Sequence, residues 1–174
     1  NEGRIVAEDV DPGKLRTLAK RAERAGAAIV ETAPAPDLDA DAEADPAFDR
    51  VLADVPCSGA GAWRRHPEAA WRLTPERLDD LASLQDELLR RAAARVRPGG
   101  RLVYVTCSLL SGENEDRIGA FLAVRWGDFR ILPVASIWPG VLEEKCPATG
   151  DCLVVSPHRT GTDGFFVAIL ERLS

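Results

Sequence analysis

Two cysteines follow strand-like segments at positions where a reactive thiol could stand. Cys57 comes after the apolar run of residues 51–53 and the turn Asp54-Val55-Pro56, and Cys107 directly follows the apolar segment 101–106. A thiolate is a strong nucleophile when its pKa is lowered, and it can add reversibly to an electron-poor ring. If the two strands are neighbours in one sheet, their ends lie about 5 Å apart, so both thiols could face one planar substrate.

The competing interpretation of a free cysteine is a small buried hydrophobic residue, which is the commoner case. Cys146 and Cys152 fit that interpretation, because nothing around them suggests chemistry. The four cysteines form no C-x-x-C pair and have no histidine cluster beside them, so the sequence predicts no metal site. Two cysteines at adjacent strand ends, in contrast, favour a functional pair.

A carboxylate also stands at a strand end. Asp9 closes the segment 4–9, immediately before a helix that Asp11 and Pro12 are suited to begin. From this position a carboxylate can accept hydrogen bonds from the hydroxyls of a ribose. An acid that merely precedes a helix is an equally good interpretation of Asp9 at this stage.

The elements that must position these residues alternate between strands and helices. Strands are expected at 4–9, 27–31, 48–54, 101–106 and 164–170, and helices at 12–25, 74–96 and from 113 onward. This alternation predicts an α/β fold with a mostly parallel, doubly wound sheet. In such sheets ligands bind beyond the carboxyl ends of the strands, where the cysteines and Asp9 fall.

Composition limits the class of protein. The chain has 174 residues, which fits a single domain, and its net charge of −6 argues mildly against nucleic-acid binding. Part of that acid lies in an Ala/Asp-rich stretch, so residues 33–47 are expected to form an acidic loop. No apolar run approaches the roughly 20 residues that span a membrane and no signal peptide opens the chain, so a cytoplasmic location without a membrane partner is expected.

The chain contains no Met and begins at Asn1, almost directly at a strand. We therefore expect it to be a fragment of a larger protein. A nucleotide-binding fold would carry a first strand and a glycine-rich turn ahead of residue 1, so we expect that part of the cofactor site to be missing.

Several motifs together resemble one family. The segment FDRVLADVPCSG at residues 48–59 is similar to the signature of the Sun/Fmu family of RNA cytosine-5 methyltransferases, and the likeness extends to the members that modify small-subunit ribosomal RNA. Further matching segments are RRHPE at 64–68, RPGGRLVY at 97–104, TCSL at 106–109, ENE at 113–115 and TDGFF at 162–166. The resemblance is loose at residues 127–160 and in the acidic loop.

The resemblance implies a class I methyltransferase that uses S-adenosyl-L-methionine to methylate carbon 5 of cytosine in RNA, with ribosomal RNA as the expected partner. Cys107 would attack carbon 6 of the base, and Cys57 would assist the elimination that frees the product. Asp54 would contact the cytosine and lie close to the cofactor, and Asp9 would bind the cofactor ribose. The reacting carbon is reachable only when the base leaves its stack, so single-stranded or extruded RNA is the expected substrate.

Two features leave alternatives open. Arg64 and Arg65 could meet RNA phosphates, or they could be an exposed basic pair. The family's second cofactor acid has no counterpart here, since residues 32–36 read TAPAP and the first acid is Asp37. The competing functions are a DNA cytosine-5 methylase with Cys57 as nucleophile, and a catalytically silent fragment that serves as an RNA- or protein-interaction module.

Overall fold

A computed structural model describes residues 1–35, 48–138 and 145–174 of the chain. The predicted acidic loop lies outside the described residues from residue 36 onward. Contacts divide the chain into two compact units, residues 1–41 and 42–174, and each is described by itself.

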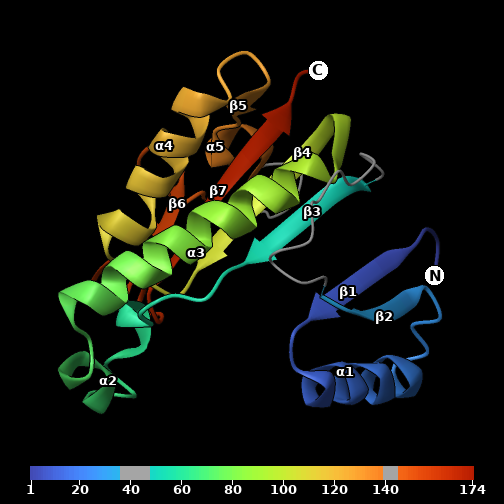
Figure 1. Cartoon of the computed structure of the whole chain (residues 1–174), viewed down its shortest axis with the longest axis horizontal. Helices are drawn as coiled ribbons and strands as arrows, with labels where there is room; N and C mark the ends of the chain where they lie inside the picture. Colours follow the sequence, from blue (N-terminus) through green and yellow to red (C-terminus); the bar gives the residue numbers. More distant parts are fainter. Residues whose placement is uncertain (36–47, 139–144) are drawn as a thin grey trace. The chain divides into compact units, whose positions relative to one another are not determined.

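The first unit is a strand–helix–strand unit (Figure 1). Strand β1 (Ile5–Asp9) is followed by helix α1 (Pro12–Arg24) and strand β2 (Val30–Pro34), and the two strands pair in parallel. Asp11 caps α1, because its side chain accepts a hydrogen bond from the Gly13 N–H, and Pro12 takes the first helical turn as expected. The β–α–β connection of the sequence-based prediction is therefore confirmed in this unit.

The second strand lies later in the chain than predicted. It was expected at residues 27–31, but those positions begin with a turn in which the Ala27 N–H bonds to the carbonyl of Ala22. Pairing with β1 starts at Ile5 opposite Val30 and ends at Asp9 opposite Pro34. The partner strand sets the register, whereas the apolar run alone gave a boundary three residues too early.

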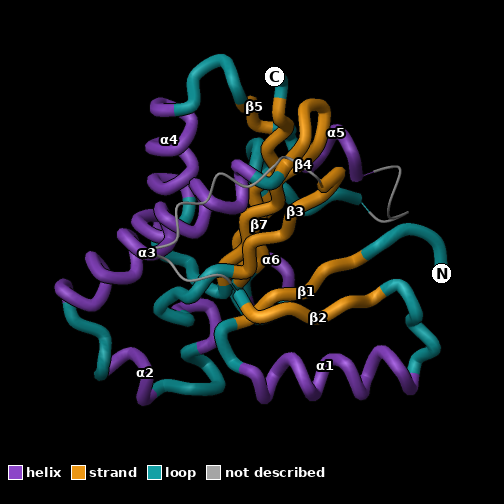
Figure 2. Tube along the Cα trace, turned by 45° about the vertical axis from the view of Figure 1, so that its right-hand side comes forward, coloured by secondary structure: helices purple, strands orange, loops and turns teal. Residues whose placement is uncertain are grey.

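The second unit contains a five-stranded sheet (Figures 1 and 2). Its strands are β3 (Phe48–Asp54), β4 (Val96–Thr106), β5 (Phe129–Ile131), β6 (Leu153–Val155) and β7 (Phe165–Arg172). The order is β3-β4-β7-β5, and β6 also pairs with β7. Strands β3 and β4 are parallel, whereas β7 runs antiparallel to β4, β5 and β6.

Strand β4 begins earlier than the predicted residue 101. Phe48 pairs with Val96, and the register then shifts so that Arg50 pairs with Arg101. The Pro98-Gly99-Gly100 segment thus forms an irregularity within the strand bounds. Past this point the pairing is regular and carries Asp54 to its place opposite Val105.

Helix α3 (Pro75–Ala94) lies across β3 and β4 and also packs against α4 (Glu115–Val124) (Figure 1). Thr74 caps α3 by accepting a hydrogen bond from the Arg77 N–H, as its sequence context predicts. The remaining helical segments among the described residues are single turns: Ala60–Ala62, α2 (Glu68–Trp71), Ser111–Glu113, α5 (Val134–Ile137) and α6 (Pro157–Thr160).

The core of this unit lies between the sheet and helices α3 and α4. Tyr104, Phe166, Leu89, Leu102 and Leu170 are fully buried there. Tyr104 and Phe166 meet edge to face, with ring centroids 6.3 Å apart. This packing fixes β4 and β7 together, and the ends of β3 and β4 then extend from a rigid base. The predicted α/β class is confirmed.

Candidate active site

The parallel strands β3 and β4 end side by side and release two similar loops. Asp54, the last residue of β3, is opposite Val105, and the Val55 N–H then donates to the Val105 carbonyl at 3.2 Å. Each chain turns away from the sheet directly afterwards. The loop after β3 carries Cys57 and Ser58, and the loop after β4 carries Cys107 and Ser108.

The two thiols are in contact. The Sγ atoms of Cys57 and Cys107 lie 3.3 Å apart, and both side chains are partly accessible to solvent. The sequence-based expectation that the two strand ends bring these cysteines together is therefore confirmed. Two sulfur atoms at this distance can both contact one small group of a bound substrate.

Burial and the neighbouring sulfur raise the pKa of the Cys57 thiol. Burial raises the pKa of the Cys57 thiol to about 12, and the adjacent Cys107 adds to the rise. Cys57 is therefore a protonated thiol at neutral pH, able to donate its S–H. A nucleophile must be deprotonated to react, so this environment suits Cys57 to hold a proton rather than to attack.

A buried carboxylate joins the two cysteine loops. Glu113, 1% exposed, accepts hydrogen bonds at 2.5 Å from the hydroxyls of both Ser58 and Ser108 on its Oε2 atom. Its Oε1 atom accepts from the Ser58 N–H at 2.8 Å and from the Gln85 amide at 3.1 Å. One side chain thus bonds the residue that follows each cysteine.

Helix and strand residues hold this carboxylate in turn. Gln85, fully buried on α3, also donates to the Pro56 carbonyl at 2.8 Å, and the Tyr104 hydroxyl donates to the Glu113 carbonyl at 2.7 Å. Asn114 accepts from the Thr106 hydroxyl at 2.6 Å and donates to the Ser108 carbonyl at 3.0 Å. The cysteine loops are therefore anchored to both α3 and β4.

A third loop closes against the first through two glycines. The Gly164 N–H donates to the Gly61 carbonyl at 2.8 Å, and the Gly61 N–H donates to the Cys107 carbonyl at 2.9 Å. A Cβ atom added to Gly61 would come within 2.1 Å of the Gly164 carbonyl oxygen. Only glycine allows this approach, so the Cys57 loop, the Cys107 loop and the segment before β7 form one backbone assembly.

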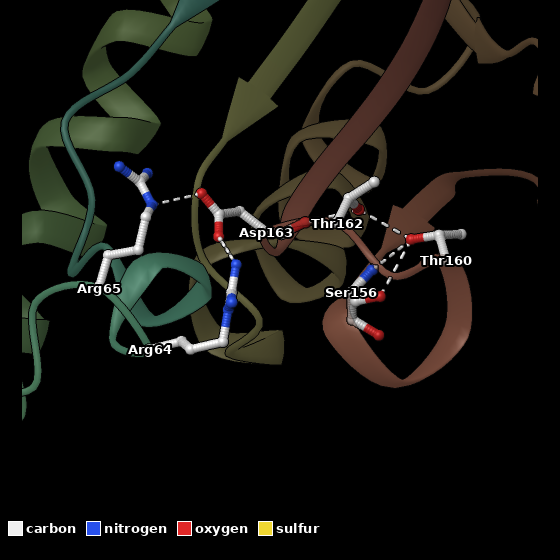
Figure 3. A network of polar contacts seen from close by, with 6 residues as sticks. All are labelled: Arg64, Arg65, Ser156, Thr160, Thr162 and Asp163. Atoms are coloured by element: carbon white, nitrogen blue, oxygen red, sulfur yellow. Dashed lines mark hydrogen bonds and ion pairs between the residues drawn. The ribbon is translucent and has the colours of Figure 1, made fainter.

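Ion pairs bind the same two segments at the surface (Figure 3). Asp163 bonds Arg65 at 2.7 Å and Arg64 at 3.4 Å, and the two arginine side chains remain 56% and 65% exposed. Beyond Asp163, the hydroxyls of Thr160 and Thr162 lie 2.8 Å apart and Thr160 returns to the backbone of Ser156. The predicted basic pair is thus partly neutralised by a carboxylate, and its role toward RNA stays a prediction.

The two predicted acids lie at strand ends as expected. Asp54 is exposed at the end of β3 and precedes the loop that carries Cys57. In the first unit, Asp9 lines a surface hollow with Val10, Leu15 and Thr32. Its carboxylate accepts from the Asp11 N–H at 2.8 Å and pairs with Lys14 at 3.2 Å.

That environment keeps Asp9 ionised. The hydrogen bond from the Asp11 N–H, with a smaller effect from Lys14, holds the pKa of the Asp9 carboxyl below its usual value. A carboxylate has about four acceptor positions, so Asp9 retains acceptor capacity beyond these two contacts.

The other two cysteines lie apart from this chemistry. Cys152 packs against the core, and burial raises the pKa of its thiol to about 11. Cys146 is partly buried. Within residues 1–35, 48–138 and 145–174, no cluster of three or more His, Cys, Asp or Glu is placed to hold a metal ion. No helix in the described part of the chain has the length and apolarity to cross a membrane.

Comparison with known proteins decides the family. Residues 1–171 match the family described as 16S rRNA methyltransferase RsmB/F. The chain belongs to this family. The resemblance drawn from the PCSG and TCSL motifs is thereby confirmed.

Individual relatives of the RsmB/F family agree. The chain is 38% identical to the mouse 28S rRNA (cytosine-C(5))-methyltransferase, over 99% of this chain and 38% of that protein. It is 36% identical to a Synechocystis protein named probable ribosomal RNA small subunit methyltransferase B, again over 99% of this chain and 38% of that protein. The crystal structure of PH0851 superposes with a TM-score of 0.83 at 35% identity, over 98% of this chain and 37% of that one. The chain thus spans less than half the length of each of these three relatives.

Membership in the RsmB/F family confirms the class I methyltransferase fold that the resemblance implied. Sequence reasoning did not identify Glu113, Ser58, Ser108 or Gln85 as parts of the site. One signal was available, since the dipeptide Cys-Ser occurs at both strand ends. Nothing in the sequence, however, indicates that Glu113, five residues after Ser108, also bonds Ser58 55 residues earlier in the chain.

Proposed function

We propose that the protein transfers a methyl group from S-adenosyl-L-methionine to carbon 5 of cytosine in RNA, with ribosomal RNA as substrate, through a covalent bond between Cys107 and carbon 6. The observation that carries this proposal is the 3.3 Å contact between the Cys57 and Cys107 sulfurs at the ends of two parallel strands. Membership in the 16S rRNA methyltransferase RsmB/F family and the name of the mouse relative support the substrate class.

Carbon 5 of cytosine is a poor nucleophile in the aromatic ring. Attack of the Cys107 thiolate on carbon 6 breaks the carbon 5–carbon 6 double bond and makes carbon 5 electron-rich. Asp54, exposed at the end of β3, would hydrogen-bond the N3/N4 edge of the base and orient carbon 6 toward Cys107. Bound S-adenosyl-L-methionine supplies the methyl group as an electrophile.

The adduct must then be resolved. Solvent water takes the proton from carbon 5, the electron pair of that C–H bond restores the carbon 5–carbon 6 double bond, and the Cys107 sulfur leaves carbon 6 with the pair of the C–S bond. Cys57 is a protonated thiol beside that sulfur, since burial raises its pKa. We propose that Cys57 assists this elimination by donating its S–H to the departing sulfur.

The residues of the first unit fit the cofactor's ribose. Asp9 ends β1 as an ionised acceptor and lines a hollow with apolar residues of α1 and β2. A carboxylate at this position of a β–α–β unit is the group that accepts from ribose hydroxyls. We therefore propose that Asp9 holds the ribose and that the apolar wall faces the rest of the nucleoside.

RNA containing 5-fluorocytidine tests the assignment of the two cysteines, because fluorine at carbon 5 cannot leave as a proton and the adduct persists. We expect a denaturant-stable complex with the wild type and with Cys57→Ala, and none with Cys107→Ala. On ordinary RNA, Cys57→Ala should accumulate adduct that wild type releases. An adduct that survives in Cys107→Ala but not in Cys57→Ala would show that Cys57 is the nucleophile.

The DNA-methylase alternative, in which Cys57 attacks, is tested by the same two variants, because it predicts an adduct that survives in Cys107→Ala and is lost in Cys57→Ala. The silent-module alternative is tested by calorimetry with S-adenosylhomocysteine. Binding that is weakened by Asp9→Asn supports the enzyme, whereas absence of binding by the wild-type protein supports the silent module.

A further inference from the structure

The two cysteine loops are bonded to Glu113 in the same way. Ser58, which follows Cys57, donates its hydroxyl to the Glu113 Oε2 atom and accepts from the N–H two residues on, that of Ala60 at 3.3 Å. Ser108, which follows Cys107, donates to the same Oε2 atom and accepts from the Leu110 N–H at 3.1 Å. Each serine oxygen is therefore held as both donor and acceptor.

Burial makes this arrangement difficult to replace. Glu113 and Ser108 are 1% and 0% exposed, so water cannot readily substitute for a lost bond between them. The distance from each hydroxyl to the carboxylate is 2.5 Å, as expected for bonds to a charged acceptor. In addition to the strand pairing and the Gly61 contact, one buried group thus bonds both loops, whose serine hydroxyls lie 3.3 Å from each other.

Stability alone is a weak explanation for this carboxylate. Among the described residues its hydrogen-bond donors are neutral groups: a backbone N–H, two hydroxyls and the Gln85 amide. Burying a carboxylate is costly, and apolar residues of similar volume would commonly stabilise a protein as well or better. What the carboxylate provides, and apolar residues could not, is a fixed relationship between Ser58 and Ser108.

We propose that Glu113 is a positioning residue for the two-thiol reaction: through Ser58 and Ser108 it fixes the spacing of Cys57 and Cys107. Glu113 acts through the serines and does not touch the reacting atoms. Its effect on methylation rests on the proposed function, whereas its effect on the distance between the sulfurs does not.

The test compares Glu113→Gln with the wild type in two measurements. The first is the rate at which diamide, which is reduced as the two thiols lose their protons and electrons, forms a Cys57–Cys107 disulfide in the intact protein without RNA or cofactor. Peptide mass spectrometry identifies the linked peptides and excludes bonds to Cys146 or Cys152. The second measurement is kcat and KM for RNA methylation.

Gln has the shape of Glu but presents N–H donors where an oxygen accepts. We expect disulfide formation to slow about tenfold and kcat to fall about 100-fold, because small displacements of reacting groups have effects of this size. The KM for S-adenosyl-L-methionine should stay within about twofold, since Glu113 belongs to the cysteine loops. A loss of folded protein would also lower the apparent kcat at unchanged KM, so kcat is expressed per folded molecule, with the folded fraction measured by circular dichroism.

Two further sets of variants serve as controls. Ser58→Ala and Ser108→Ala each remove one of the two bonds and should give intermediate losses, and Glu113→Gln should add little in the Ser58→Ala/Ser108→Ala background. Phe129→Leu lowers stability in the core at β5, away from the loops, and should leave both measurements unchanged.

The proposal is overturned if Glu113→Gln keeps the wild-type disulfide rate and kcat, or if Phe129→Leu reproduces its losses at equal stability. If the wild type does not methylate RNA, the proposed function fails while the disulfide rates still decide the role of Glu113.

Discussion

The Sγ atoms of Cys57 and Cys107 lie 3.3 Å apart although 50 residues separate them in the chain. Parallel pairing of β3 with β4 accounts for the meeting, because Asp54 and Val105 reach the same edge of the sheet and the loops turn together. Glu113 bonds the serine that follows each cysteine, and the Gly61 N–H donates to the Cys107 carbonyl. These contacts lead to measurable consequences.

The raised pKa of Cys57 predicts a loss of stability at alkaline pH. The thiol ionises near its usual pKa of 9.0 in the unfolded chain but near 12 in the folded protein, so the unfolded state releases its proton first as the pH rises. This contribution is therefore fully present below about pH 9 and is lost between about pH 9 and 12. The side chain is only partly buried, so the effect should be modest.

Urea denaturation at about pH 8 and about pH 10.5 measures this effect. Cys57→Ala should show a smaller drop of the midpoint between the two conditions than the wild type. Cys152→Ala is the matched variant and should show a smaller drop for the same reason, because burial raises the pKa of the Cys152 thiol to about 11. An equal drop in wild type and Cys57→Ala contradicts the assignment.

Gly61→Ala should destabilise the protein by about 1–3 kcal/mol or more, because overpacking at a close backbone contact has effects of this size. The new methyl group would meet the Gly164 carbonyl oxygen at 2.1 Å, and neither backbone can move without breaking the bond between them. Gly119→Ala is the control, since a Cβ there meets nothing within 4 Å and the position is helical. Thermal denaturation should show Gly119→Ala neutral or stabilised, and a similar result for Gly61→Ala would refute the prediction.

Asp163→Asn should release Arg64 and Arg65 for RNA phosphates. We expect tighter binding to single-stranded RNA at low salt, because a carboxylate that competes with phosphate is removed. Stability should change by at most about 1 kcal/mol, since the arginines are exposed.

Replacing both arginines by Gln should reduce the slope of log affinity against log salt by about 1 to 2. Filter binding over a salt series measures both effects. An unchanged slope would show that the arginines serve the loop and not the RNA.

Asp9→Asn should weaken S-adenosylhomocysteine binding about tenfold, since a ribose hydroxyl loses a charged acceptor. The pKa of Asp9 lies below its usual value, so wild-type affinity should be independent of pH above about pH 5. Calorimetry measures both, with Glu31→Gln as control, because Glu31 is an exposed acid of the same unit that pairs with Arg4. Equal affinities of Asp9→Asn and wild type would remove Asp9 from the cofactor site.

The sequence predicted the features that depend on neighbouring residues. Strand β3, the capped helix α3 and the end of β4 before Cys107 all follow from local apolar runs, Pro and capping residues. Strand β2 was placed too early, because its register depends on β1 and not on its own apolar residues. Local signals were thus sufficient to predict β3, α3 and the end of β4, whereas the bounds of β2 depend on its long-range pairing with β1.

The same limit applies to the site. Cys57 and Cys107 could be paired because parallel strand ends meet at one edge of a sheet. Glu113 reaches the site from a turn before α4, and Asp163 reaches the arginines from the segment before β7. No periodicity or spacing records such contacts, since they arise only when distant loops fold against each other.

The shared carboxylate has a consequence for protein engineering. Copying the PCS and TCS segments onto another doubly wound sheet would transplant two thiols without the group that aligns them. A designer would also need the turn that carries Glu113, together with Gln85 from α3, which donates to the same carboxylate. The smallest portable unit of this chemistry is therefore two strand ends plus one helix and one turn, and it is discontinuous in the chain.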